Sequence, residues 1–455
     1  MTFQHIKTLF LLLLSLQILT AQITPIGSGS YTTQFPGTDE AGRNGYPSGS
    51  PITTGIAATK PAPTNDWWSA KIKNNHADNL FNYPYTLKTV NQGLITAYIP
   101  WGVIGDAQPI TVGVTGLNAN AAKVADFSDW TVTMDWSNSD HNFQVTSGIG
   151  MPFLYFAKAQ NDVAQINVAS GSVTIADEML VITDAIHGAD FAVYAPMGST
   201  WTQSGNNYTS TLNGKNYWSM AFLPQSASSV NAVAAEYQQY AYVFPTNTTT
   251  TWGYDESTST VRTDFVVETE VKEGSDNKML MGLLPHQWAN LAAGSPTPSG
   301  YSYPTVRGEM KTLEGNSFSV ENTFYGILPT LPYVDNYSEG FNPQKLDEKV
   351  QLLENDGLAT WTDSYNEGQV MNRLIQTARI ADLMGNTTAR DKMVETVKER
   401  LEDWLDANAN EVAFLFYYND TWSALLGYPA GHGQDNNIND HHFHWGYFIH
   451  AASFM

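Results

Sequence analysis

The 455-residue sequence contains no cysteine, so disulfide bonds cannot stabilise its fold. Positive charge is also scarce, because 22 Lys and Arg stand against 44 Asp and Glu and give a net charge of −22. A chain without a basic face is a poor partner for nucleic acid or for an anionic membrane surface. Stability must therefore come from the burial of large apolar cores, and a chain of this length predicts roughly two to four domains.

Long hydrophobic runs are missing except at the N-terminus. Lys7 precedes an apolar stretch from Leu9 to Leu19, and Thr20-Ala21-Gln22 offers a cleavage point, although Leu19 occupies a position where a small residue is usual. The apolar stretch is shorter than a comfortable membrane span. We therefore predict a secretory signal peptide over residues 1–21 and a secreted protein.

The remaining sequence changes character along its length. Residues 22–63 are rich in Gly, Ser, Thr and Pro and predict a flexible lead-in. Residues 64–271 contain short runs rich in Val, Ile, Thr and aromatics between turn residues, which predicts a large β-sandwich. Residues 272–338 hold strand-like pieces with prolines at their ends and predict a small linking domain. From 339 to 455 the apolar residues recur at helical spacing and predict about four helices.

The last twenty residues hold the densest cluster of chemically active side chains. The run "DHHFHWGYFIHAASF" fits a helix whose N-cap is Asn439 or Asp440, and an earlier helix is expected to end at Gly385-Asn386. Three interpretations of this cluster stay open. His442 and His444 with Asp440 could bind a metal, although the spacing His-x-His alone is weak evidence. The histidines and aromatics could simply pack the base of a helical domain.

The third interpretation is a sugar-cleaving site. Glycoside hydrolysis needs one carboxylic acid to protonate the leaving oxygen and a second carboxylate to activate water or to attack. Asp440 is the candidate acid, with histidines and Tyr447 bonding sugar hydroxyls and Trp422 or Trp445 stacking on sugar rings. A difficulty is that a helix N-terminus stabilises an aspartate as the anion, whereas a proton donor must hold its proton. The low charge and high aromatic content suit a neutral, hydroxyl-rich polysaccharide, and equally suit ordinary sandwich cores.

Seven segments together resemble glycoside hydrolase family 81, the inverting endo-β-1,3-glucanases. The most specific is the segment around Asp440, and the other six precede it in the order expected for the family. They are "PTNDWWSA" (63–70), "YPYTLKTVNQGL" (83–94), "LLPHQW" (283–288), "VRGEMKTLEGNSF" (306–318), "YGILPTLP" (325–332), "FYYNDTWSALLG" (416–427) and "NDHHFHWGYFIHAASF" (439–454).

The resemblance implies an N-terminal β-supersandwich, a small α/β linking domain and a C-terminal (α/α)6 barrel that holds the active site. It implies that Asp440 is the proton donor, that the substrate is a β-1,3-glucan and that neither a cofactor nor a metal is needed. By their positions in similar segments, five further residues are expected to contact substrate: Tyr365, Asp420, Trp422, His444 and Tyr447.

The family's second carboxylate is a glutamate well downstream of this aspartate, beyond Met455. We therefore expect this chain to be a fragment that ends within the catalytic barrel and is inactive alone. The acids already present in the helical part, Glu354, Asp356, Asp363 and Glu367, are interpreted as exposed helix residues. The alternative function is a non-catalytic β-glucan-binding protein, whose binding would depend on aromatics such as Trp67 or Trp68.

Overall fold

The computed structural model describes residues 23–37, 51–52, 60–61, 63–64, 66–99, 104, 107–326, 339–356, 361–408 and 411–455. The predicted signal peptide lies outside these residues, as does most of the segment 325–332 that resembles the family's domain junction. The chain divides into two compact units, which we name the β unit (52–60 and 66–327) and the helical unit (1–51, 61–65 and 328–455).

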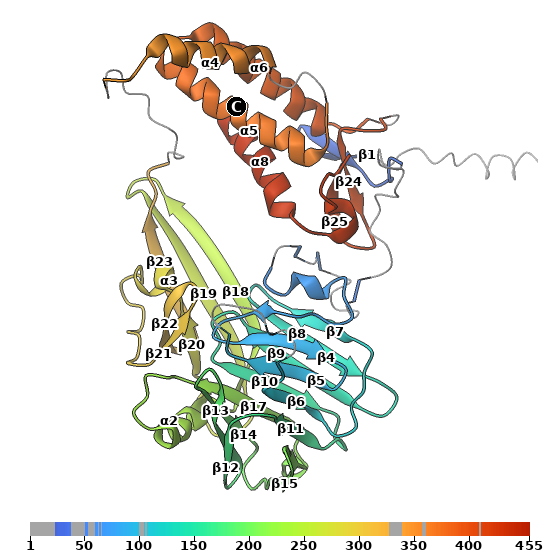
Figure 1. Cartoon of the computed structure of the whole chain (residues 1–455), viewed down its shortest axis with the longest axis vertical. Helices are drawn as coiled ribbons and strands as arrows, with labels where there is room; N and C mark the ends of the chain where they lie inside the picture. The colour runs from blue at the N-terminus through green and yellow to red at the C-terminus, as the bar shows by residue number, and fades with distance from the viewer. Residues whose placement is uncertain are drawn as a thin grey trace, which may run out of the picture. The chain divides into compact units, whose positions relative to one another are not determined.

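Two large antiparallel sheets form most of the β unit (Figure 1). The first has eight strands in the order β12 (Ser172–Ala176), β13 (Met179–Ile186), β14 (Ala189–Tyr194), β17 (Tyr217–Leu223), β10 (Phe153–Lys158), β9 (Asn142–Gly148), β8 (Thr131–Ser137) and β7 (Ala122–Phe127). The second has seven strands in the order β15 (Thr202–Ser204), β16 (Asn207–Ser210), β11 (Ala164–Val168), β6 (Ile110–Val114), β5 (Gly93–Ala97), β4 (Thr86–Val90) and β3 (Leu80–Phe81).

Burial patterns explain why these segments are strands. In β9, alternate residues from Phe143 to Ser147 are buried, the period expected of a strand with one face inward. In β17, which lies between β14 and β10, all seven residues are buried because both faces are covered. Tyr85, the residue just before β4, packs its ring on the eight-stranded sheet against Phe191 of β14 and Phe222 of β17 at centroid distances of 6.1 and 5.9 Å.

Two three-stranded sheets complete the β unit. One has the order β18 (Val243–Asp255), β19 (Thr260–Val271) and β23 (Ser317–Thr323); the other has the order β20 (Met279–Leu283), β22 (Gly308–Gly315) and β21 (Ser302–Thr305). The described residues of the unit also form α2 (Val230–Tyr237), α3 (Pro285–Trp288) and the short 3-10 turns η2 (Ser69–Lys71), η3 (Leu212–Gly214) and η4 (Gln238–Tyr240).

The linking domain predicted over residues 272–338 stays a prediction, and the described part of it packs against the eight-stranded sheet. Met279 and Leu313 share one buried cluster with Phe153 and Ala221 of the eight-stranded sheet. Residues 272–326 therefore belong to the β unit.

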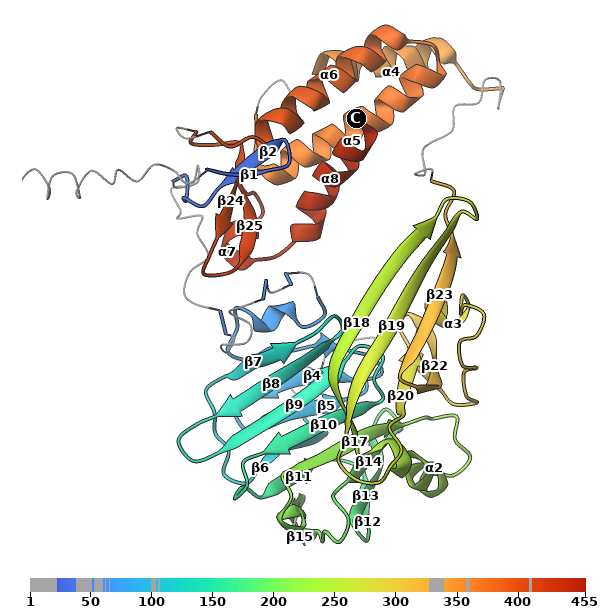
Figure 2. The same cartoon turned by 180° about the vertical axis from the view of Figure 1, so that it is seen from behind.

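The helical unit contains α4 (Pro343–Asp356), α5 (Ser364–Leu383), α6 (Thr387–Trp404), α7 (Gln434–Asn437) and α8 (His441–Phe454). Helix α5 packs against both α6 and α8, and Figure 2 shows α5 and α8 side by side. As predicted, α5 ends just before Gly385, which adopts φ 79° and so supplies the left-handed residue that closes many helices. Among the described residues, no helix combines the length and hydrophobicity needed to cross a membrane.

Part of the expected flexible lead-in is ordered structure. Strands β1 (Ile23–Ile26) and β2 (Gly29–Thr32) join β24 (Leu415–Asn419) and β25 (Ala424–Tyr428) in one four-stranded sheet. Thr32 pairs in parallel with Tyr417, and the Ser30 hydroxyl donates to Asp406 Oδ1 at 3.0 Å. Residues 23–32 were expected to bury little, but backbone pairing with a distant strand supplies the partners that their composition did not indicate.

The broad order of the predicted architecture, strands first and helices last, is confirmed. Seven α-helices occur in the described residues, five of them in the helical unit. The supersandwich and the (α/α)6 barrel stay predictions.

Candidate active site

Asp440 stands at the point where a loop enters α8. Its backbone is left-handed, with φ 56° and ψ 20°, a conformation that aspartate tolerates better than most residues. Although Asp440 occupies the N-cap position, as predicted, its half-buried side chain makes no capping hydrogen bond to the helix. Asn439 Nδ2 donates to Asp440 Oδ2 at 2.9 Å instead. The Asp440 carboxylate thus makes its side-chain hydrogen bond to Asn439 and not to the backbone of α8.

Tyr365 and Tyr447 form an aromatic cluster with His432. The Tyr365 ring lies 4.3 Å from the His432 ring and 6.0 Å from the Tyr447 ring, measured between centroids. Helices α5 and α8 cross closely here because residue 368 is glycine: a Cβ at this position would lie 2.8 Å from Cβ of Tyr447. Burial raises the pKa of Tyr447, and the neighbouring Tyr365 adds to the effect. Tyr447 is therefore a neutral hydroxyl at ordinary pH.

The three histidines at the start of α8 have different environments. His441 and His444 are buried, whereas His442 is exposed. Burial lowers the pKa of both His441 and His444 to about 4, although the Asp440 carboxylate acts in the opposite direction on each. Both buried imidazoles are therefore neutral at pH 7.

The metal-binding interpretation fails on helical geometry. Residues two apart on an α-helix point to opposite sides, so His442 and His444 cannot share one ion. In the part of the chain that the structure describes, no group of three His, Cys, Asp or Glu residues is arranged to hold a metal ion.

His444 connects the two halves of the candidate site. Its backbone N–H donates to the carbonyl oxygen of Asp440 at 3.2 Å, and its ring lies 5.3 Å from the ring of Tyr365. The side chain, however, has 0% exposure. The predicted direct contact between His444 and a sugar is therefore not available in this structure.

Asp363, interpreted from the sequence as an exposed acid, is the N-cap of α5. Its Oδ1 accepts hydrogen bonds from the backbone of Tyr365 at 3.0 Å and of Asn366 at 2.9 Å. Gly431, in the loop after β25, approaches so closely that a Cβ there would lie 2.3 Å from Asp363 Oδ1. This glycine thus permits the close packing of the loop on the start of α5.

Glu367 was also expected to be exposed, and this was wrong. Its side chain has 0% exposure and accepts from the Thr362 backbone N–H at 3.1 Å, while Arg400 Nη1 lies 3.4 Å from Oε1. The Arg400 guanidinium stacks 3.6 Å from the centre of the Trp361 ring. Burial raises the pKa of Glu367, and the Arg400 charge opposes this shift. The pair fastens the start of α5 to α6.

Two other predicted site residues lie between β24 and β25. Asp420 is exposed at this turn, whereas Trp422 is only 3% exposed. A ring with so little free surface cannot stack on a sugar, so the predicted role of Trp422 does not fit the structure. Trp68, proposed for the binding alternative, has 0% exposure, and Trp67 is half-buried.

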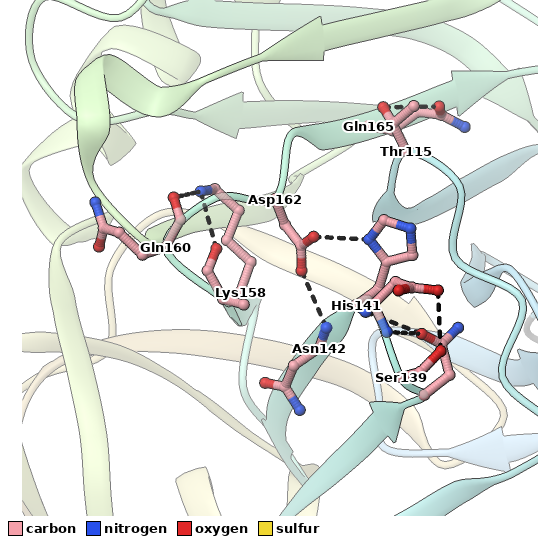
Figure 3. Close-up of polar contacts among 11 residues, drawn as sticks. Thr115, Ser139, His141, Asn142, Lys158, Gln160, Asp162 and Gln165 are labelled. Carbon is pink, nitrogen blue, oxygen red and sulfur yellow. Dashed lines mark hydrogen bonds and ion pairs between the residues drawn. The ribbon is translucent and has the colours of Figure 1, made fainter.

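A polar cluster in the β unit superficially resembles a catalytic triad (Figure 3). His141 Nδ1 lies 2.7 Å from Asp162 Oδ1, and Ser139 is nearby. The Ser139 hydroxyl, however, donates to Asp140 Oδ2 at 2.9 Å, and a Cβ on Gly116 would lie only 2.9 Å from His141 Nε2. Because that nitrogen faces Gly116 rather than a nucleophile, we interpret the cluster as fastening the turn between β8 and β9 to the loop at Asp162.

The arrangement around Asp440 supports acid chemistry on a neutral, hydroxyl-rich ligand. It provides a carboxyl group that does not cap its helix, and the neutral Tyr447 hydroxyl, which can exchange hydrogen bonds with hydroxyls, lies two turns further along α8. The structure brings Tyr365, His444 and Tyr447 together at the starts of α5 and α8. Sequence reasoning missed Ser364, which links these helices, and the buried pair of Glu367 and Arg400.

Known proteins resemble this chain over nearly its whole length. The family model "Glycosyl hydrolase family 81 C-terminal domain" matches residues 345–455. A glucan endo-1,3-beta-D-glucosidase from Thermobifida fusca is 35% identical over 444 residues, which cover 94% of this chain and 57% of the relative. One from Acetivibrio thermocellus is 35% identical over 408 residues, which cover 86% of this chain and 51% of the relative.

A solved structure gives the same result. The glycoside hydrolase family 81 protein from Clostridium thermocellum, solved as a mutant, superposes with a TM-score of 0.77 and 32% sequence identity, covering 95% of this chain and 60% of that one. The chain thus spans between half and three-fifths of the length of these relatives. Sequence, family model and fold agree, and the chain belongs to glycoside hydrolase family 81.

Proposed function

We propose that this protein is a secreted, inverting endo-β-1,3-glucanase in which Asp440 is the general acid. The observation that carries the proposal is the environment of Asp440: a half-buried carboxyl group that makes no capping bond to α8 and whose helix packs beside Tyr365. Relatives that are 35% identical and named glucan endo-1,3-beta-D-glucosidases support the substrate class.

In the proposed reaction, Asp440 gives its proton to the glycosidic oxygen as the bond from C1 to that oxygen breaks. A second carboxylate takes a proton from water, whose oxygen attacks C1 from the opposite face of the sugar. We assign this role, following the family resemblance, to a glutamate further along the polypeptide than Asp440. The two carboxyl groups should lie roughly 6.5–9.5 Å apart, which leaves room for the water. No cofactor takes part.

The test uses protein expressed from its whole reading frame and measures reducing ends released from a soluble β-1,3-glucan. Asp440→Asn should lower kcat by about 10²–10⁴-fold, the usual contribution of a general acid. Asp382→Asn is the matched control, because Asp382 is an exposed acid at the other end of α5. NMR of the first product should show the α-anomer. Full activity in Asp440→Asn would overturn the proposal, and glucan binding without hydrolysis by the unsubstituted protein would favour the non-catalytic alternative.

Secretion has its own test, which does not depend on activity. The composition of residues 1–21 supports export followed by cleavage after Ala21. Mass spectrometry of protein collected outside the cell should find Gln22 as the first residue. An N-terminus that retains Lys7 in exported protein would contradict the proposed cleavage.

A further inference from the structure

Ser364 lies between two hydrogen-bonding groups at the start of α5. Its hydroxyl oxygen is 2.6 Å from the carbonyl oxygen of Ala430 and 2.8 Å from Nδ1 of His444. Its backbone N–H donates to the carbonyl of Pro429 at 2.8 Å. Ser364 and His444 each have 0% exposure. One serine thus joins the start of α5, the loop after β25 and the start of α8.

The number of hydrogens available settles the direction of each bond. A serine hydroxyl carries one hydrogen, and a backbone carbonyl can only accept. The hydroxyl hydrogen must therefore point to Ala430, since otherwise two oxygens 2.6 Å apart would face each other with no hydrogen between them. The Ser364 oxygen is then left to accept, so the hydrogen in its contact with His444 resides on Nδ1.

The charge state of the ring follows from its burial. His444 is neutral at pH 7, because burial lowers its pKa to about 4. A neutral imidazole has one N–H, so with the hydrogen on Nδ1 the other nitrogen, Nε2, carries a lone pair. Nε2 is buried and has no hydrogen-bond partner among the described residues.

We propose that Ser364 is a positioning residue that locks His444 in the neutral Nδ1–H tautomer and thereby sets the spacing between Asp440 and Tyr365. The lock acts through the His444 ring, which packs against Tyr365, the residue after Ser364, while the backbone of His444 is joined to the Asp440 carbonyl by an ordinary bond of α8. Because His444 has no exposed surface, it acts on a ligand through these neighbours. The consequence for catalysis rests on the proposed function, whereas the tautomer itself does not.

The packing around Ser364 leaves its hydroxyl little freedom. A Cβ on Gly427 would lie 2.7 Å from Cβ of Ser364 and 3.4 Å from the Trp404 ring, so glycine is needed for this approach. Held between Gly427 and Ala430, the oxygen cannot turn away from His444 without losing one of its two bonds.

The first experiment reads the tautomer directly. Protein labelled with ¹⁵N-histidine is studied by long-range ¹H–¹⁵N NMR, and the His444 signals are identified by their loss in His444→Gln. We expect a protonated Nδ1 and an unprotonated Nε2 in the unsubstituted protein, unchanged between about pH 8 and pH 6, where burial keeps the ring neutral. A hydrogen on Nε2 would overturn the proposal without any serine variant.

The second experiment tests whether Ser364 is responsible. Ser364→Ala should shift the His444 signals toward the other tautomer or a mixture of both. The matched control is Ser453→Ala, because Ser453 donates to a backbone carbonyl in the same helix, at 2.8 Å from His450 O, and is exposed. An unchanged His444 signature in a folded Ser364→Ala protein would show that another group holds the ring, and would overturn the assignment.

The third experiment measures the consequence for glucan hydrolysis. Displacement of catalytic groups by about 1 Å can cost up to about 100-fold in rate, so Ser364→Ala should lower kcat by up to that factor and change KM less. If Asp440→Asn keeps its activity, the proposed function fails while the tautomer result stands. If Asp440→Asn loses activity and Ser364→Ala keeps its kcat despite a changed tautomer, the positioning role is refuted.

Discussion

Removal of the Arg400 charge should destabilise the helical unit strongly. Arg400 and Glu367 form a buried ion pair, with side-chain exposures of 7% and 0%. When one partner of a buried pair is removed, the other charge stays buried without compensation, at a cost of about 3–5 kcal/mol. Arg400→Met keeps much of the packing and removes the charge. For a unit of this size, such a loss lowers the melting temperature by roughly 6–20 °C.

The matched control is Arg390→Met in the same helix. Arg390 pairs with Asp382 and Asp391, but its side chain is 34% exposed, and exposed pairs contribute only about 0–1 kcal/mol. Thermal and urea unfolding should be measured for both variants. Each variant removes one positive charge, so the difference in lost stability reports the difference between a buried and an exposed arginine. If Arg400→Met costs no more than Arg390→Met, the buried pair does not stabilise the start of α5 as inferred.

The pH dependence gives an independent check. Because burial raises the pKa of Glu367, the folded state binds this proton more tightly than the unfolded state. The stability that this proton contributes is fully present below pH 4.5, the pKa of Glu367 in the unfolded state. It is lost as pH rises through the pKa of Glu367 in the folded state. When the Arg400 charge is removed, the pKa of Glu367 in the folded state rises further, because that charge lowers it. Arg400→Met should therefore lose more stability at about pH 7.5 than at about pH 5, and Glu367→Gln combined with it should abolish the difference.

Three further predictions concern other sites. Gly368→Ala should cost about 1–3 kcal/mol in unfolding free energy, because its Cβ would lie 2.8 Å from Cβ of Tyr447. Burial lowers the pKa of Lys71 to about 7 from 10.5, so the unfolded state binds more protons between these values; urea unfolding should show stability rising over that range, and Lys71→Met should remove the slope. Phe443 and Ile449 on α8 are 50% and 68% exposed, and replacing both with serine should reduce binding of a hydrophobic dye.

Local sequence signals predicted the positions of helix ends and the approximate order of elements. The Gly385 helix end and the N-cap position of Asp440 were both found, because turn and cap residues act on their immediate neighbours. The pairing of β2 with β24 was not found, since Thr32 and Tyr417 are far apart in the sequence and the composition near Thr32 resembles a loop. Strands so far apart in the sequence pair only when the fold brings them together, which the residues near Thr32 do not reveal by themselves.

The burial of Glu367 could have been predicted from the helical pattern. Met371, Leu374 and Ala378 follow it by four, seven and eleven positions, which places all four on one face of α5, and the structure buries all four. A carboxylate on the apolar face of a helix needs a buried partner, so this spacing should have directed attention to an arginine on a neighbouring helix. The prediction that Glu367 is exposed rested on its charge alone, whereas the helical period of α5 indicated that it is buried.

The roles of the histidines depend on contacts that the motif does not contain. In α8, the buried residues His441, His444, Phe448 and Ala451 follow helical spacing, so the pattern separates His444 from the exposed His442. It does not reveal Ser364, which is 80 positions away and bonds to His444 only because α5 and α8 pack together. A histidine in a family motif therefore need not touch the ligand: here its burial and its serine partner make it part of the support on which Asp440 and Tyr365 are held.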